Sequence, residues 1–276
     1  MTDAVLLDDR SVVEIIGSDA AKFLHNLVTN DMLKLGFGEA RFCALLTPQG
    51  KIIVDFLAFA QGEGETRSFL LDCPKSLVDE LVRRLGMYKL RAAVTIALRA
   101  DLAAYGFLDA GRPQVDAKAL ARDPRAEALG WRALAPLGAI EASARRTDYE
   151  ARRVAAGVPQ GGVDFAYGEA FPHEANMDLL SGVDFKKGCY VGQEVVARMK
   201  HRGLARKRVA RYRAHGAAPA AGTAIVAGEK EIGVTGSNSG DSGLALIRLD
   251  RLEEALAAGA APHAAGVRLK FSNLPG

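Results

Sequence analysis

Short apolar segments, separated by turns rich in glycine and asparagine, follow one another from Lys207 to the end of the chain. This pattern is typical of a small closed β-barrel, whose strands are brief and are joined by tight turns. One helix, from Arg251 to Ala258, is expected between the later strands. We therefore predict that residues 205–276 form a C-terminal β-barrel domain. Its expected strands are 209–213, 224–226, 232–235, 244–248 and 267–271.

Residues 1–204 mix strand and helix patterns, which predicts an α+β architecture for the larger part of the chain. Apolar runs bounded by turn residues indicate strands, and apolar residues at helical spacing indicate helices. Pro74 is expected to begin one helix and Gly86 to end it. The expected strands are 12–16, 42–46, 52–57, 69–72, 94–98 and 102–107, and the expected helices are 20–27, 74–86 and 149–156.

The span from Gly157 to Gly192 has no regular pattern. Irregular segments of this length inside a compact domain are usually functional or disordered. Its aromatic residues, among them Phe165, Tyr167 and Phe171, argue against disorder. We expect this span to line a pocket.

Residues 187–194, here called the cysteine motif, place Cys189 between two glycines and lead directly into a helical pattern. Gly188 and Gly192 permit backbone angles and close contacts that a side chain would prevent. The start of a helix and the neighbouring lysines favour the thiolate form of the cysteine. A buried, unreactive cysteine in an ordinary glycine turn is equally compatible with this spacing.

Asp55 interrupts an otherwise apolar strand. An unpaired carboxylate inside a core is costly, so this residue is expected to have a partner or to line a cavity. A position on the solvent face of the strand is the alternative, because side chains alternate between the two faces.

The densest basic run of the chain extends from Arg198 to Arg213. Such a run is suited to phosphate, to a polyanionic tail or to nucleic acid. It is equally compatible with a solvated basic surface, because Tyr212 is the lone aromatic residue among these positions and base-stacking surfaces usually carry more.

The overall charge does not identify a partner, because 36 Lys and Arg residues nearly balance 33 Asp and Glu residues. Cys43, Cys73 and Cys189 are far apart and form no C-x-x-C pair, which argues against a disulfide framework and against a metal site built by this chain alone. The N-terminal region lacks the basic and apolar stretches of a signal peptide, and no apolar run is long enough to cross a bilayer. We expect a cytoplasmic protein without a membrane partner.

Several of these segments together resemble the YgfZ family of folate-binding proteins. That family is related to the aminomethyltransferase, or T-protein, of the glycine cleavage system, and it is linked to the assembly or repair of iron–sulfur clusters. The resemblance covers nearly the whole chain. It is carried by residues 17–20, 23–24, 29–31, 48–51, 153–154, 157–159, 174–176, 182–185, 187–194, 201–203 and 206–208, together with Asp55 and Asp178.

The resemblance implies a T-protein-like fold, in which two interleaved α+β subdomains surround a central channel and a β-barrel follows. Tetrahydrofolate or a derivative is the implied cofactor and would occupy the channel. The implied catalytic residues are Cys189 and Asp55, and no metal ligand is implied. The implied folate-binding residues are Asn30, Arg153, Glu174, Asn176, Lys187, Tyr190, Gln193, Glu194 and Arg198.

One departure from the T-proteins bears on the folate site. The T-proteins carry Arg-x-Glu on a helix where this chain has Arg153-Val154-Ala155, and their glutamate grips the pterin ring. A carboxylate accepts two parallel hydrogen bonds from the pterin, whereas alanine accepts none. The pterin is therefore expected to be held differently, through Glu174 or through backbone groups, or to be bound weakly.

The function implied by the resemblance is that of an accessory protein that binds tetrahydrofolate and supports the assembly, maintenance or repair of iron–sulfur enzymes. Iron–sulfur client or assembly proteins are then the expected partners. A folate-dependent aminomethyl or one-carbon transferase is the alternative, with Asp55 assisting proton transfer. A tRNA-binding protein acting in tRNA modification ranks lower, and so does a cysteine hydrolase that uses His173 or His201.

Overall fold

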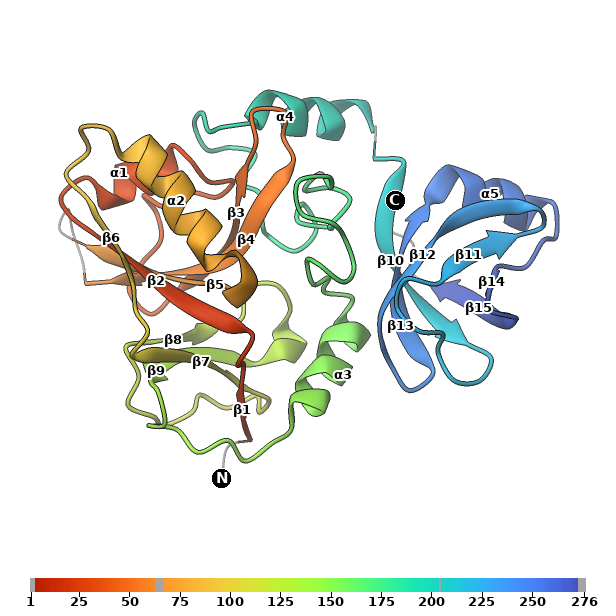
Figure 1. Ribbon diagram of the computed structural model, residues 1–276, viewed down its shortest axis with the longest axis horizontal. Coiled ribbons are helices and arrows are strands. Elements are labelled where there is room, and N and C mark those ends of the chain that lie inside the picture. Colours follow the sequence, from red (N-terminus) through yellow and green to blue (C-terminus); the bar gives the residue numbers. More distant parts are fainter. Residues whose placement is uncertain (1–2, 63–66, 204, 273–276) are drawn as a thin grey trace.

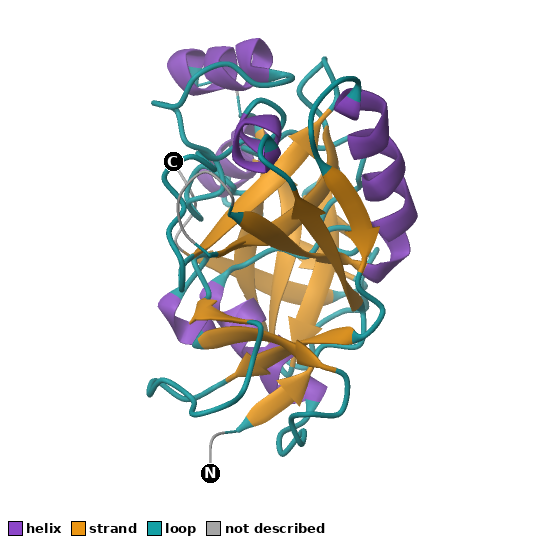
Figure 2. Ribbon diagram, turned by 90° about the vertical axis from the view of Figure 1, so that its left-hand side faces the viewer, coloured by secondary structure: helices purple, strands orange, loops and turns teal. Residues whose placement is uncertain are grey.

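The computed structural model describes residues 3–62, 67–203 and 205–272. It contains a five-stranded sheet, a four-stranded sheet and a closed six-stranded barrel. The two open sheets lie together on one side, and the barrel lies beside them next to helix α3 (Arg146–Ala156) (Figure 1). In the perpendicular view the helices lie at the outside, around the strands (Figure 2).

The five-stranded sheet is antiparallel, with the strand order β3-β4-β5-β2-β6. Alternate residues of its strands point to opposite faces. On β4, Val54 and Phe56 pack with helices α1 and α2, whereas Leu57 and Phe59 lie in the core on the other face. The bounds are β2 (Arg10–Ile16), β3 (Ala40–Leu46), β4 (Ile52–Gln61), β5 (Ser68–Pro74), β6 (Thr95–Leu98), α1 (Ala20–His25) and α2 (Val78–Lys89).

The four-stranded sheet has the order β1-β7-β9-β8 and is also antiparallel. Its first strand precedes the five-stranded sheet in sequence, and its other strands follow that sheet, so the two sheets are interleaved along the chain. Leu102, Ala104 and Leu134 of this sheet share a core with Leu57 and Phe59 of the other. The bounds are β1 (Ala4–Leu6), β7 (Leu102–Phe107), β8 (Ala119–Arg122) and β9 (Trp131–Pro136), with 3-10 turns at Lys75–Leu77 and Glu127–Leu129.

Helix α3 and the segment after it connect the two sheets with the barrel. The helix ends at Gly157, whose φ of +71° is the left-handed conformation that glycine adopts readily. Residues 158–192 then contain no helix and no strand other than an isolated bridge, and α4 (Gln193–Arg202) follows. The expected irregular span is therefore confirmed.

The barrel has the strand order β10-β13-β12-β11-β14-β15. Ile225, Ile247 and Leu269 fill its interior. On its outer side, Val209 and Leu244 pack against Val154 of α3, which fixes the barrel to the rest of the molecule. The bounds are β10 (Lys207–Ala214), β11 (Ala224–Ala227), β12 (Lys230–Ser239), β13 (Ser242–Arg248), α5 (Leu249–Ala257), β14 (His263–Ala264) and β15 (Val267–Ser272).

Gly86 does not end the second helix, because α2 continues to Lys89, and a glycine on an exposed helix face costs only about 1 kcal/mol relative to alanine. The expected domain division between residues 204 and 205 stays a prediction, since Leu204 lies outside the described residues. None of the helices within the described ranges has the length and apolar character required to cross a membrane.

Candidate functional site

A cavity of about 280 Å³, here called the central cavity, opens between the five-stranded sheet, α3 and the irregular span. The β2 end supplies Arg10, β4 supplies Asp55, and α3 supplies Glu150 and Arg153. The irregular span contributes Pro159–Val163 and Tyr167, as expected from its sequence.

Asp55 faces this cavity and is 7% exposed, because it lies on the β4 face opposite to Val54 and Phe56. The Tyr167 hydroxyl donates a hydrogen bond to Asp55 Oδ1. Burial, reinforced by the Asp55 carboxylate, raises the pKa of Tyr167, so the phenol stays protonated and remains a donor. Asp55 thus has a partner and lines a cavity, and the solvent-facing alternative is wrong.

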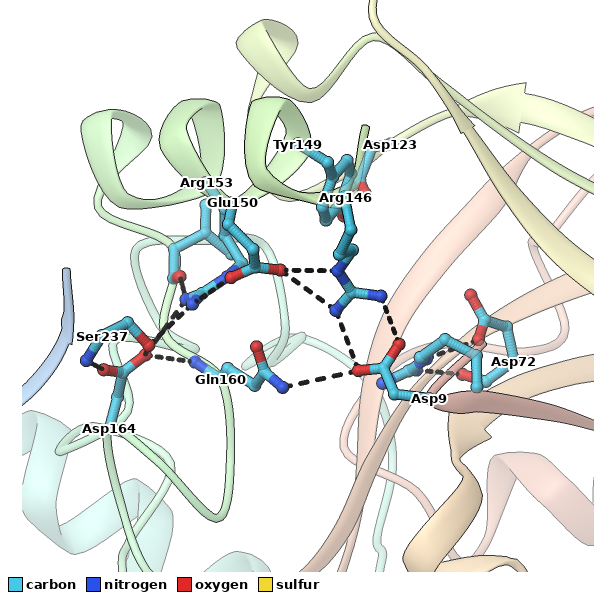
Figure 3. A network of polar contacts seen from close by, with 12 residues as sticks. Asp9, Asp72, Asp123, Arg146, Tyr149, Glu150, Arg153, Gln160, Asp164 and Ser237 are labelled. Carbon is cyan, nitrogen blue, oxygen red and sulfur yellow. Dashed lines mark hydrogen bonds and ion pairs between the residues drawn. The ribbon is translucent and has the colours of Figure 1, made fainter. Parts of the chain in front are cut away.

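Five arginines line the central cavity, and each is ion-paired. Arg146 spans two carboxylates, those of Asp9 and Glu150, as the close-up shows (Figure 3). Because every guanidinium has a carboxylate partner, the cavity wall is strongly polar while its charges largely cancel. The pairs are Arg10–Asp72, Arg125–Asp123, Arg132–Asp72, Arg132–Asp123, Arg146–Asp9, Arg146–Glu150, Arg153–Glu150 and Arg153–Asp164.

Two acceptor groups at this cavity were missed by the sequence analysis. Glu150 accepts from Arg153 at 2.7 Å and from Arg146 at 3.0 Å, and its side chain keeps 25% exposure. The Gln160 amide donates to Asp9 at 3.4 Å, and its carbonyl oxygen receives no hydrogen bond from the described residues (Figure 3). The available signal for Glu150 was its position three residues before Arg153 on the same helix, a spacing that brings the two side chains together.

The cysteine motif does not line the central cavity, because it lies on α1 and on the turn between β3 and β4. The Lys187 ammonium donates to the carbonyl oxygens of His25 and Val28 at the end of α1. Burial lowers the pKa of Lys187 to about 8. Lys187 therefore holds the motif onto α1, and its side chain points away from the central cavity.

The two glycines of the cysteine motif differ in how closely neighbouring atoms approach them. Gly192 has a φ of +83°, and a Cβ there would lie 2.6 Å from the Thr47 carbonyl oxygen, so only glycine fits without strain. A Cβ on Gly188 would meet nothing closer than His25 Nε2 at 3.8 Å. The close contact that the sequence predicted at the motif glycines is therefore found at Gly192 and not at Gly188.

Cys189 is exposed, whereas Cys43 and Cys73 are buried. Burial raises the pKa of both buried thiols to about 12, so at neutral pH they are protonated and unreactive. The alternative of a buried Cys189 is therefore wrong. Neither His173 nor His201 forms a hydrogen bond with Cys189 among the described contacts, and no three His, Cys, Asp or Glu side chains within the described ranges are grouped as a metal site.

The other residues assigned to folate by resemblance are spread around the molecule. Asn30 is buried and donates to the carbonyl oxygens of Phe42 and Ser181. Glu174 accepts from the Phe171 amide at 2.9 Å, and Asn176 donates to the Val209 carbonyl of the barrel at 2.7 Å. Tyr190 is buried in the main core, whereas Gln193, Glu194 and Arg198 lie on α4. Of the predicted site residues, Asp55 and Arg153 line the central cavity.

The basic run from Arg198 to Arg213 does not form one surface. Arg208 is buried and pairs with Asp178 at 2.9 Å, Arg211 donates to the Ala155 carbonyl, and Arg213 pairs with Asp241 at 3.1 Å. The side chain of Arg202 and the whole of Leu204 lie outside the described part of the chain. Three arginines of the run are thus engaged in contacts within the protein, so the run as a whole is not an open surface for tRNA.

The arrangement of interleaved sheets and barrel defines a class. The crystal structure of the glycine cleavage system aminomethyltransferase T from Bartonella henselae superimposes with a TM-score of 0.75 at 15% identity, covering 99% of this chain and 86% of that chain. Residues 206–273 match the family model described as the CAF17 C-terminal beta-barrel domain. The chain therefore has the T-protein fold with a C-terminal barrel.

Sequence relatives narrow the class to a family. The chain is 33% identical to the mitochondrial iron–sulfur cluster assembly factor IBA57 of Mus musculus and 32% identical to that of Homo sapiens, each alignment covering 90% of this chain and 78% of the relative. It is 33% identical to an IBA57 homologue of Pyricularia oryzae over 74% of this chain and 55% of that relative. The chain belongs to the family of IBA57 iron–sulfur cluster assembly factors, which is part of the YgfZ family.

These relatives also correct one expectation. The mouse, human and fungal proteins are all named as mitochondrial. The expectation of a cytoplasmic protein is therefore wrong, and the relatives point to the mitochondrion instead. It rested on the missing features of one kind of signal peptide, and such features do not report on mitochondrial targeting.

Proposed function

We propose that this protein is a tetrahydrofolate-binding accessory factor that supports the assembly, maintenance or repair of iron–sulfur enzymes. Its relatives are named iron–sulfur cluster assembly factors, and its fold is that of an aminomethyltransferase. The folate part of the proposal rests on the central cavity, whose lining includes the Glu150 carboxylate, the Gln160 amide and the buried Asp55.

The residues of the central cavity fit a pterin ring. The ring presents N–H donors on one edge, and Glu150 together with the free carbonyl oxygen of Gln160 offers acceptors for them. Glu150 would thus replace the glutamate that the T-proteins carry at the position of Ala155. A volume of about 280 Å³ lies near the lower end of small-molecule pockets, about 300–1,000 Å³, so it suits the ring while the rest of the folate extends outward.

Glu174, which the sequence analysis offered as the substitute for Ala155, does not fit this role. Its carboxylate accepts the Phe171 amide within its own loop and does not line the central cavity. Among the residues proposed for the pterin, Glu150 has the stronger case, because it lies on the same helix as Arg153 and faces the cavity (Figure 3).

Cys189 is the functional thiol of this proposal. It is the exposed one of the three cysteines, all of which lie in the described part of the chain, and it directly precedes the buried Tyr190 that anchors the motif in the core. An accessible thiol can exchange with or ligate a partner's cluster, whereas Cys43 and Cys73 are shielded by burial.

Complementation tests this function. A strain that lacks its own YgfZ-family protein is given the wild-type chain, Cys189→Ala or Cys73→Ala, and the activity of a cluster-dependent enzyme is measured. The proposal predicts rescue by the wild type and little rescue by Cys189→Ala. Cys73→Ala serves as the control for loss of a thiol, provided that its protein level equals that of the wild type. Full rescue by Cys189→Ala would show that the thiol is structural.

A folate-dependent one-carbon transferase is the second candidate. Asp55 lies in the central cavity, Tyr167 donates to its Oδ1, and its Oδ2 accepts no hydrogen bond from the described residues. The free oxygen is available for proton transfer. Formation of formaldehyde or methylene-tetrahydrofolate from candidate amine donors is measured for the wild type and Asp55→Asn. A large loss in Asp55→Asn supports the transferase, and equal rates in both proteins eliminate it.

A further inference from the structure

A second cavity of about 780 Å³, here called the basic cavity, shares no lining residue with the central cavity. Its walls come from the segment after α1, from β3, from the end of β8, from the irregular span and from α4. Nothing in the proposed function uses this cavity. Its charged lining residues are Glu39, Arg41, Arg122, Asp178, Asp184, Lys186 and Lys200.

The cations of the basic cavity are unpaired, whereas its acids are engaged. Arg41, Arg122, Lys186 and Lys200 form no ion pair among the described residues, in contrast to the five arginines of the central cavity. Asp178 pairs with buried Arg208 at 2.9 Å. The other two acids keep their negative charge while they accept backbone N–H groups: Asp184 from Lys186 and Lys187, and Glu39 from Gly36. Because Arg208 offsets Asp178, four cations of the cavity stand against two carboxylates, and the cavity carries a net positive charge.

Neutral groups hold three of these four cations in place. Arg41 donates to the Asn30 side-chain oxygen at 3.1 Å. The Arg122 guanidinium lies 4.9 Å from the centre of the Trp131 ring, and the Lys200 ammonium lies 3.6 Å from the centre of the Phe185 ring. Such contacts restrict a side chain without cancelling its charge. The positive charge is thus positioned in advance of any ligand, which lowers the cost of binding.

The hydrogen bonds of Asn30, the partner of Arg41, show how firmly one edge of the cavity is built. Asn30 is buried, and its amide nitrogen donates to the carbonyl oxygens of Phe42 and Ser181 at 2.9 and 2.7 Å. Its oxygen is therefore fixed toward Arg41 and toward the Asp31 amide. Asn30, assigned to folate by resemblance, acts here as a positioning residue for a cation.

Cationic side chains lie against the aromatic rings of the basic cavity, and this argues against a nucleobase as its ligand. Binding of a nucleobase requires an open ring face for stacking. The Trp131 ring has both Arg112 and Arg122 against it, and the Phe185 ring has Lys200. A ligand would therefore meet guanidinium and ammonium groups, which recognise carboxylate and phosphate oxygens.

We propose that the basic cavity binds a small polyanion that carries two or more carboxylate or phosphate groups. Its volume lies within the range of about 300–1,000 Å³ that is usual for small-molecule sites. The four cations come from four different segments, namely β3, β8, the irregular span and α4, and can meet separate anionic groups of one ligand. The site is independent of the folate proposal, because none of its residues lines the central cavity.

Isothermal titration calorimetry tests this proposal with two probes, tripolyphosphate and citrate, which distinguish phosphate from carboxylate ligands. The full chain is titrated at low and at physiological ionic strength. We expect at least one probe to bind, with an affinity that falls as salt rises because the contacts are ionic. The double variant Arg122→Gln/Lys200→Gln should lose about tenfold or more in affinity.

A charge-matched control is the double variant Arg213→Gln/Lys230→Gln, which removes two exposed, ion-paired cations of the barrel. It should bind as the wild type does, and so should Glu150→Gln in the central cavity. Circular dichroism checks that each variant is folded, and the single variant Lys186→Gln takes the place of Arg122→Gln/Lys200→Gln if that double variant is not. Absence of binding by both probes, or an equal loss in the barrel control, would overturn the proposal.

Discussion

The Arg153 guanidinium of α3 donates to the Ser237 hydroxyl of β12 at 2.7 Å, and this contact joins the wall of the central cavity to the barrel. Asp164 completes the junction, because it accepts from Arg153 at 3.0 Å and from the Ser237 amide at 2.6 Å (Figure 3). A Cβ on Gly236 would lie 2.2 Å from the Asp164 carboxylate, so the approach also depends on glycine. This network therefore links the wall of the central cavity to the barrel, alongside the apolar contact of Val154 with Val209 and Leu244.

Arg153→Met should destabilise the protein strongly, because it leaves Asp164 buried without its cation. Loss of one partner of a buried ion pair typically costs about 3–5 kcal/mol. The free energy of unfolding is measured in urea. The control is Arg83→Met on α2, where an exposed pair with Glu80 is lost and the change should stay below about 1 kcal/mol. Equal effects of the two substitutions would show that the network is not a stabilising junction.

Asp123→Asn should remove a pH-dependent part of the stability. Burial by itself raises the pKa of Asp123, but Arg125 and Arg132 outweigh it and lower the pKa to about 2. A carboxyl with a pKa lowered on folding stabilises the protein above its unfolded pKa, near 4, and this stabilisation is lost as pH falls through about 2. It amounts to roughly 2 kcal/mol at neutral pH.

Urea unfolding of wild type and Asp123→Asn between pH 7 and pH 2 checks this expectation. The difference in unfolding free energy between the two proteins should be constant from pH 7 to about pH 5 and should shrink between about pH 4 and pH 2. A difference that stays the same throughout this range would contradict the assignment of a lowered pKa to Asp123.

Gly192→Ala and Gly188→Ala form a matched pair within the cysteine motif. The alanine at position 192 must adopt a positive φ and collide with the Thr47 carbonyl, so a loss of about 1–3 kcal/mol is expected. At position 188 nothing closer than 3.8 Å opposes the new methyl group, and the change should be within about 0.5 kcal/mol. Thermal unfolding of both variants measures the difference, and similar melting temperatures would refute the account of this turn.

Local sequence patterns predicted much of the fold. The barrel strands, the end of α3 at Gly157 and the irregular span all depend on short-range rules of turns, caps and periodicity. The division of the remaining chain into two sheets was not worked out from periodicity and came from the resemblance. Strand pairing joins β1 to β7, about a hundred residues further along the chain, and no local pattern reports such a contact.

The candidate site was predictable only in part, for a physical reason. Asp55 was identified because a carboxylate in an apolar strand is locally anomalous, whereas Glu150 looked like an ordinary helical surface residue. Glu150 belongs to the cavity wall through its ion pair with Arg146. Arg146 also pairs with Asp9, which lies 137 residues from it in the sequence. Lys187 shows the opposite case: its position in the motif suggested a ligand, but burial at the end of α1 directs its ammonium to backbone carbonyls.

Cys189 should be the thiol that reacts in the native protein. It is exposed, whereas burial raises the pKa of Cys43 and Cys73 to about 12 and shields both from reagents. With iodoacetamide, mass spectrometry should find one modified cysteine in the folded wild type and none in Cys189→Ser. All three should react in the wild type after unfolding. Rapid modification of Cys43 or Cys73 in the folded protein would be incompatible with the described burial.

The most direct test of the central claim is the affinity of the purified protein for tetrahydrofolate, measured by calorimetry for the wild type, Glu150→Gln and Glu80→Gln. Glu80 is a matched control, because it also pairs with two arginines on one helix but lines neither the central cavity nor the basic cavity. We predict that the wild type and Glu80→Gln bind alike and that Glu150→Gln binds about tenfold or more weakly. No binding by the wild type, or equal binding by all three folded proteins, would contradict the claim that the central cavity holds the pterin of a reduced folate through Glu150.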